Sequence, residues 1–349
     1  MTEFRSELSS LRPQQRTADA QMNLRPEAAS RHSGQDGPGR TSDRCLTGDD
    51  GGPVGFGTLE VMAKAMEASG RYRILRRLEP RTTIDAPDGT LTRRGIFLDV
   101  ETTGLDPVTD EIVELAMLPF DYTDDGRIFA VHEPFDALRD PGRPIPPAVT
   151  ALTGISDGMV ARAAIDPAEV ANFIRSAALL IAHNAEFDRP FCEKFCPDFA
   201  TAAWACSWRE IPWKEEGFEG ARLSQLAAGH GLFFDGHRAV HDCRAGIEIL
   251  GRPLPRSGRR ALGALLESAG RPRWRVWAAG APYGKRAILK GRGYRWSDGN
   301  DGRPKSWYSD VADDAIESEL QYLRDEIYGR HVEIEPCRIT AFDRYSGRY

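Results

Sequence analysis

Five stretches rich in apolar residues have the pattern of β-strands, and most of the stretches between and after them follow a helical period. The first three strand-like stretches are joined by turns, and the last two alternate with helical stretches. The predicted strands are 95–104, 111–122, 127–135, 178–184 and 201–210, and the main predicted helices are 166–177, 186–195, 223–231 and 240–250. This order predicts an α/β domain built on a mixed five-stranded sheet with helices on both faces.

Composition changes on both sides of this domain set its expected boundaries. Residues 1–55 are rich in Ser, Gly, Gln, Asp and Arg without a sustained apolar period, which predicts a disordered N-terminal extension. Residues 56–94 are expected to form a small helix and strand before the domain at 95–250. The Pro-, Arg- and Gly-rich stretch 251–270 predicts a linker. Residues 271–349 predict a second, basic and aromatic-rich domain with a terminal helix.

Charge is divided unevenly along the 349 residues, whose net charge is −6. Residues 95–250 hold 12 Lys and Arg against 26 Asp and Glu, whereas residues 252–305 hold 14 against 3, a net charge of +11. No apolar stretch approaches the roughly 20 residues that cross a bilayer, and the start of the chain lacks the pattern of a secretory signal. The six cysteines form no CxxC pair. We therefore expect a cytoplasmic protein with reduced thiols and no membrane partner.

Residues 271–308 mix cations with aromatic residues, including four of the seven Trp of the chain. Cations can follow a phosphate backbone and flat rings can stack on bases, so this composition favours binding of single-stranded nucleic acid. The alternative is a small β-rich domain whose Trp residues form its core, with Arg at its solvated rim. The cations expected to contact nucleic acid are Arg273, Arg275, Lys285, Arg286, Lys290, Arg292 and Arg295.

Two acidic residues lie side by side at the end of the first predicted strand. Side chains alternate across a strand, so Asp99 and Glu101 face the same side. Two buried carboxylates this close are unfavourable unless a positive charge lies between them. Oxygen ligands are those of a hard cation, so the pair predicts Mg²⁺ or Mn²⁺.

Two further segments carry chemistry at the start of predicted helices. Asp188 follows the fourth strand in the segment HNAEFD, and His237 precedes Asp242 by five residues in HRAVHD. Together with FLDVETTGLDP around Asp99, these segments resemble, in order and spacing, the three motifs of the DEDDh superfamily of 3′–5′ exonucleases. The proofreading epsilon subunit of bacterial DNA polymerase III and ribonuclease T belong to this superfamily. The resemblance covers residues 95–250 and implies a ribonuclease H-like sheet.

The resemblance also implies a role for each site residue. Two metal ions would be held by Asp99, which bridges them, by Glu101 and Asp242, and by Asp188 in support. His237 would be the general base, since it matches the motif histidine, although His241 competes for this role. Residues expected to contact the terminal nucleotide are Thr102, Thr103 and Phe187.

These expectations predict a metal-dependent 3′–5′ exonuclease that acts on DNA more readily than on RNA. A DNA polymerase or a repair protein is a possible partner. Two alternatives stay open: a ribonuclease or oligoribonucleotide trimmer of the same superfamily, and a nucleic-acid-binding protein with a vestigial site. The sequence sets no oligomeric state.

Overall fold

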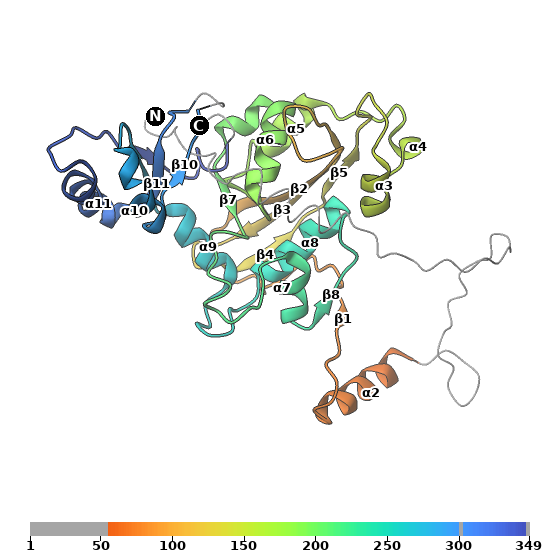
Figure 1. Ribbon diagram of the computed structural model, residues 1–349. Helices are drawn as coiled ribbons and strands as arrows, with labels where there is room; N and C mark the ends of the chain where they lie inside the picture. The colour runs from red at the N-terminus through yellow and green to blue at the C-terminus, as the bar shows by residue number, and fades with distance from the viewer. Residues whose placement is uncertain (1–54, 300–302, 347–349) are drawn as a thin grey trace, which may run out of the picture.

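A six-stranded mixed sheet lies at the centre of the computed structural model, which describes residues 55–299 and 303–346 (Figure 1). The strand order is β4-β3-β2-β6-β7, and β5 also pairs with β3. β3 is antiparallel to β2, whereas β6 and β7 continue the sheet in parallel. Its strands are β2 (Arg93–Thr102), β3 (Ile112–Tyr122), β4 (Ile128–Val131), β5 (Phe135–Leu138), β6 (Leu179–Ala182) and β7 (Trp204–Cys206). The predicted mixed α/β fold is confirmed.

Helices cover both faces of the sheet because the residues of β2 alternate between two cores. Ile96, Leu98 and Val100 pack in the core that contains α5 and α6, whereas Phe97 packs in the core that contains α7, α8 and α9. The helices of this part of the chain are α3 (Pro147–Thr153), α4 (Asp157–Val160), α5 (Pro167–Ile174), α6 (Ala185–Phe195), η1 (Pro197–Thr201), α7 (Leu223–Gly229), α8 (Ala239–Leu250) and α9 (Ala261–Gly270). Even-numbered and odd-numbered residues of β2 therefore pack against different sets of helices.

The third predicted strand is divided in two. β4 and β5 both pair with β3, and residues 132–134 separate them. Pro119 of β3 has no N–H to donate to its neighbour, and its carbonyl accepts the N–H of His132 at 2.9 Å. The sheet thus gains a sixth strand where the sequence pattern indicated one long third strand.

The segment 251–270 is part of the core rather than a linker, and that expectation was wrong. It contains α9, whose residues Leu262 and Leu265 are fully buried against the sheet face that α8 covers. The small and charged residues around α9 concealed its short apolar face in the sequence pattern.

A second sheet follows α9, with the order β10-β11-β9-β12. Its elements and helices are β9 (Arg273–Ala278), η2 (Tyr283–Lys285), α10 (Arg286–Gly291), β10 (Arg295–Trp296), β11 (Trp307–Ala312), η3 (Asp313–Ala315), α11 (Ile316–Tyr322), the π-helical η4 (Leu323–Tyr328) and β12 (Cys337–Ile339). The expected terminal helix is therefore followed by a strand. After β12 the chain returns to the first sheet, where Ala341 accepts the backbone N–H of Trp204 at 2.7 Å.

The N-terminal helix α2 (Phe56–Ala68) projects from the body of the molecule (Figure 1). Arg76 binds Glu60 and Glu67 of this helix, and β1 (Arg76–Arg77) pairs in parallel with β8 (Leu232–Phe233). The disorder expected for residues 1–55 concerns residues that, apart from Gly55, lie outside the described part of the chain.

The described residues can be compared with what composition predicted about membrane spans and about the cysteines. No helix among them has the length and apolarity needed to cross a bilayer. The cysteines that the structure describes, from Cys192 to Cys337, are free thiols.

Candidate active site

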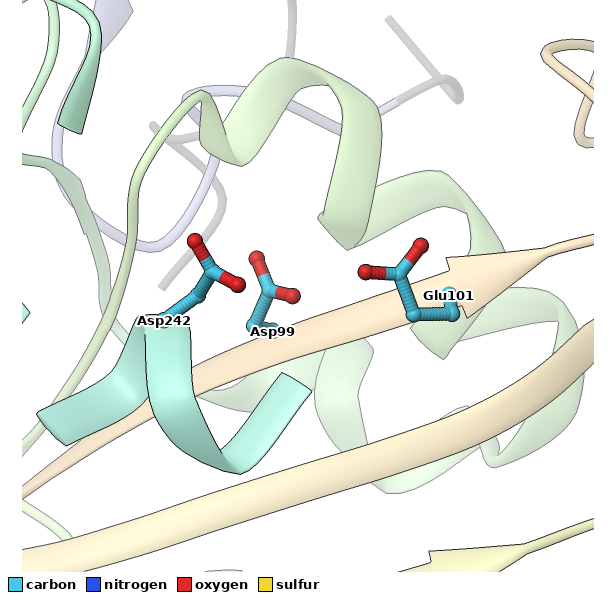
Figure 2. A group of neighbouring side chains, drawn as sticks. All are labelled: Asp99, Glu101 and Asp242. Carbon is cyan, nitrogen blue, oxygen red and sulfur yellow. The ribbon is translucent and has the colours of Figure 1, made fainter. Parts of the chain in front are cut away.

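Three carboxylates meet at the end of β2 (Figure 2). Asp99 and Glu101 lie on β2, and Asp242 lies in the first turn of α8. One oxygen from each of these three carboxylates lies within 4.8 Å of the other two. Asp99 and Glu101 lie two and four residues after Phe97 on β2, so their side chains point to the same face of the sheet, the face that α8 covers. The structure thus brings Asp242 next to two acids of β2 that lie far earlier in the sequence.

Gly246 allows α8 to come close to β2. A Cβ atom at this position would lie 2.2 Å from the ring of Phe97, so only a residue without a side chain fits. Asp242 lies one helical turn earlier, on the same side of α8. The contact between Gly246 and Phe97 therefore sets the distance at which Asp242 faces the carboxylates of β2.

The environment of the three carboxylates disfavours their charged forms. Burial, followed by the charges of Asp188 and Asp242, raises the pKa of Asp99 well above its ordinary value. Burial and the charge of Asp242 do the same to the pKa of Glu101. Burial raises the pKa of Asp242 to about 7, against the effect of the backbone N–H of His237, which donates to this carboxylate at 2.8 Å.

The donor set fits a divalent metal ion. All three groups offer carboxylate oxygens, the ligands that Mg²⁺ and Mn²⁺ prefer. A cation among them would also remove the repulsion and the cost of burial that raise their pKa values. The cluster could therefore hold a metal ion through Asp99, Glu101 and Asp242.

Asp188 reaches the same end of β2 from the opposite layer. It lies in the first turn of α6, is 2% exposed, and accepts the backbone N–H of Val100 at 3.3 Å. Its charge contributes to the raised pKa values of Asp99 and Glu101. Asp188 thus belongs to the electrostatic environment of the cluster.

The two histidines differ in their surroundings. His237 is exposed just before α8 and has a left-handed backbone with φ of 64°. Partial desolvation lowers the pKa of its imidazole below the ordinary value. His241, in the first turn of α8, is engaged elsewhere, because its Nδ1 lies 3.0 Å from the carbonyl oxygen of Asp235. This geometry favours His237 over His241 as the free imidazole at the site.

The sequence analysis missed Glu114 and Arg238. Glu114 lies directly opposite Glu101 in the sheet and is fully buried. It accepts hydrogen bonds from the guanidinium of Arg238, the nearest at 2.7 Å, and from the backbone N–H of Ala239 at 2.9 Å. Glu114 therefore anchors the start of α8, in the turn that carries Asp242. The signal was available, since Glu114 interrupts the apolar run of β3 between Ile112 and Phe120.

The residues expected to contact a terminal nucleotide are largely packed inside the protein. Thr102 and Thr103 are buried, and the hydroxyl of Thr103 donates to Asp110 at 3.1 Å. Phe187 is half-buried, with its ring centroid 5.1 Å from that of Phe191. The Thr103 hydroxyl and part of the Phe187 ring are therefore already in contact with other groups of the protein.

Three of the seven cations expected to bind nucleic acid are used inside the C-terminal domain. Arg275 is fully buried and binds Asp310 at 2.9 Å, so its expected contact with a phosphate was wrong. Arg295 binds the same carboxylate at 2.8 Å, and Arg292 binds Glu319 at 2.8 Å. In the described residues, no ion pair involves the other four: Arg273, Lys285, Arg286 and Lys290.

The part of the chain that contains these carboxylates is similar to known exonucleases. Residues 96–250 match the family model of the RNase_T exonucleases. A DNA polymerase III subunit epsilon-like protein of Rhodobacter capsulatus is 44% identical over 102 residues, 28% of this chain and 14% of that protein. A PolC-type DNA polymerase III of Listeria monocytogenes is 35% identical over 156 residues, 42% of this chain and 10% of that protein. The matches thus span only a small part of these relatives.

Solved exonuclease structures show a looser likeness. Exonuclease I of Escherichia coli in complex with single-stranded DNA is 16% identical, with a TM-score of 0.43 over 64% of this chain and 63% of that one. Exonuclease X in complex with 5′-overhanging duplex DNA is 23% identical, with a TM-score of 0.35 over 50% of this chain and 92% of that one.

The raised pKa of Asp242 predicts a pH dependence of stability in the metal-free protein. Its pKa is about 7 in the folded chain and about 3.9 in an unfolded one. Between these values the folded state holds a proton that the unfolded state has lost. The contribution of Asp242 to the free energy of unfolding should therefore fall as the pH rises from about 4 to about 7, by at most about 4 kcal/mol. Chemical denaturation in EDTA across this range measures it.

Asp242→Asn removes the titrating group, so this variant should lose less stability than the wild type as the pH rises. Asp314→Asn, which changes an exposed acid outside the site, should behave as the wild type does. Saturating Mn²⁺ should stabilise the wild type most at the higher pH, because the ion competes with the proton. Equal pH slopes for the wild type and Asp242→Asn in EDTA would contradict the environment assigned to Asp242.

Glu114→Gln should weaken binding of Mn²⁺ by roughly 10- to 100-fold, the usual effect of losing a residue that orients metal ligands. The amide keeps the shape of the side chain but loses the charge that holds Arg238 at the start of α8. Isothermal titration with Mn²⁺ measures the change. Glu111→Gln, which alters a more exposed carboxylate just before the same strand, is the control. Unchanged affinity in a folded Glu114→Gln protein would refute the anchoring role.

Proposed function

Because residues 96–250 belong to the DEDD exonuclease superfamily, we propose that this protein is a metal-dependent exonuclease that removes nucleotides from the 3′ end of DNA. The observation that carries the proposal is the convergence of Asp99, Glu101 and Asp242 at one end of β2. The 3′–5′ direction follows from the superfamily that the three motifs resemble. DNA as the substrate follows from the names of the curated relatives, which are DNA polymerase III proteins.

Two Mg²⁺ or Mn²⁺ ions are the proposed cofactors. Asp99 would contact both ions, Glu101 and Asp242 would complete the site, and Asp188 would support it from α6. Such a pair lowers the pKa of the attacking water and neutralises charge on the phosphate and on the departing 3′ oxygen. The protein contributes carboxylates whose pKa values are raised chiefly by burial, and those of Asp99 and Glu101 also by the charges of neighbouring acids.

His237 is the proposed general base. Its lowered pKa keeps the imidazole neutral near pH 7, the form that accepts a proton. Its side chain is exposed, while its backbone N–H is bound to Asp242. The residue can therefore take a proton from a water molecule near the cluster while its backbone stays fixed to one of the proposed metal ligands.

The proposal includes contacts with the substrate. Thr102 and Thr103 would offer backbone groups to the terminal nucleotide, and the exposed part of Phe187 would pack on its base. Arg273, Lys285, Arg286 and Lys290, which form no ion pair within the described residues, would contact phosphates farther along the strand. Association with a DNA polymerase or a repair protein rests on the names of the relatives alone. The complete acid set argues against a protein that only binds nucleic acid.

Hydrolysis of a 5′-labelled single-stranded DNA oligomer tests the proposal. A 3′–5′ exonuclease should produce a ladder of progressively shorter labelled products in Mg²⁺ or Mn²⁺ and none in EDTA. Asp99→Asn should reduce the rate by at least about 10³-fold, because it removes the carboxylate shared by both proposed ions, and His237→Gln by roughly 10²- to 10⁴-fold. Asp314→Asn is the control.

Two results would overturn this function. Hydrolysis that survives Asp99→Asn at the wild-type rate would exclude the proposed chemistry, and early release of labelled mononucleotide would exclude the direction. An RNA oligomer of matched sequence distinguishes the ribonuclease alternative. Faster digestion of DNA than of RNA supports the proposal, whereas the reverse assigns the protein to RNA.

A further inference from the structure

An open groove lies on the C-terminal domain, apart from the acidic cluster. It has a volume of about 370 Å³ and runs between the second sheet and the turn that leads into α10. Three aromatic side chains line it, Tyr283, Trp296 and Trp307, together with two cations, Arg286 and Lys305. Its remaining lining consists of small residues, Ala278, Gly280, Ala281 and Ser306. The groove thus combines flat apolar walls with positive charge.

The aromatic residues of this domain fall into two groups. Tyr294 and Tyr308 are buried and serve the fold, Tyr308 under the guanidinium of Arg275. In contrast, Tyr283 is 80% exposed and Trp296 is 36% exposed. Trp296 pairs across the strands with Trp307, their ring centroids 5.6 Å apart in an edge-on arrangement. Tyr283 and Trp296 therefore present flat surfaces to solvent, whereas Trp307 also packs against the core of this domain.

The cations of the groove are likewise not used by the fold. Arg275, Arg292 and Arg295 form ion pairs inside the domain, as described above. Neither Arg286 nor Lys305 has an ion pair within the residues that the structure describes. The guanidinium of Arg286 lies 4.2 Å from the centre of the Tyr283 ring, where it also shapes the wall of the groove.

We propose that this groove binds single-stranded nucleic acid, with bases stacked on Trp296 and Tyr283 and phosphates bound by Arg286 and Lys305. Charge complementarity selects this occupant, because the groove is lined by two cations and by no acid and the strand is a polyanion. Stacking on exposed rings is tolerant of base sequence, which suits a strand that is being shortened. The inference rests on the proposed function only in that the ligand is the same polymer as the substrate.

Binding is tested with the full chain carrying Asp99→Asn, so that the strand is not digested. Fluorescence anisotropy of a labelled oligo(dT) of about 20 nucleotides in EDTA should show roughly tenfold weaker binding for Tyr283→Ala and for Trp296→Ala, the effect expected of a lost stacking ring. Trp296→Phe keeps a flat ring and should restore most of the affinity. Arg286→Gln with Lys305→Gln should lower the slope of log K against log salt by about 1 to 2.

Two variants outside the groove serve as controls. Tyr72→Ala removes an aromatic ring that is 55% exposed, and Lys214→Gln removes an exposed cation of the first domain. Affinity in the groove variants equal to that of these controls would overturn the inference. So would displacement of the labelled oligomer by an acidic peptide at a much lower concentration than unlabelled oligo(dT) requires, because that result assigns the groove to a protein partner. Tyr283→Ala changes a mostly exposed side chain, so its result does not depend on refolding of the core.

Hydrolysis by the chain with an intact Asp99 separates this inference from the proposed function. Trp296→Ala should raise KM for a 30-nucleotide DNA and leave kcat/KM for a trinucleotide unchanged, because the short substrate should not occupy both sites. Normal digestion together with unaltered binding in the groove variants would contradict the proposed binding site in the groove and would support the exonuclease activity. No digestion by the wild type, together with weaker DNA binding by the groove variants, would contradict the exonuclease activity and would support the binding site in the groove.

Discussion

The repulsion among buried carboxylates at the end of β2 is the constraint on which the proposed site depends. Asp99, Glu101 and Asp242 are close enough for each to disfavour the charge of another, and burial adds to the effect. A protein keeps such an arrangement when a cation resolves it. The fold maintains the crowding in two ways: Gly246 lets α8 approach the sheet, and Glu114 fixes the start of α8 through Arg238. Both features make the acids harder to separate.

The C-terminal part of the chain completes the first domain as well as forming its own sheet. Arg189 follows Asp188 in α6, is fully buried, and donates to the carbonyl oxygen of Phe342 at 2.6 Å. Arg344 binds Glu210 at 2.7 Å, and both side chains of this ion pair are buried. Removing the last residues would leave buried charges without these partners, which is strongly destabilising. The two sheets are therefore coupled next to the helix that carries Asp188, and point substitutions separate their roles better than truncation does.

Patterns between near neighbours in the sequence predicted the faces of the strands and the starts of the helices. The alternation along β2 placed Asp99 and Glu101 on one face, and the spacing of the motifs placed Asp188 and Asp242 at the starts of helices, as the structure has them. The break between β4 and β5 depends on a missing N–H at Pro119, in a neighbouring strand. The hydrophobic pattern of one β-strand does not reveal a missing hydrogen-bond donor in the strand beside it.

The errors arose where long-range contacts decide the outcome. The charge of Arg275 suggested a phosphate contact, but Asp310, which is 35 residues away, holds it inside the domain. Helix α9 has too short an apolar face to stand out from its Pro- and Arg-rich surroundings. Likewise, the charge interrupting β3 is visible in the sequence, but its partner Arg238 lies 124 residues away. Tertiary pairing of charges is thus the information that periodicity lacks.

Anomalous diffraction from crystals soaked in Mn²⁺ tests the central claim most directly. The account predicts two manganese peaks at the end of β2, with oxygens of Asp99, Glu101 and Asp242 as ligands. The same soak of Asp99→Asn should lose at least one of the peaks. Manganese bound elsewhere on the protein, with no anomalous density among these three carboxylates, would contradict the account.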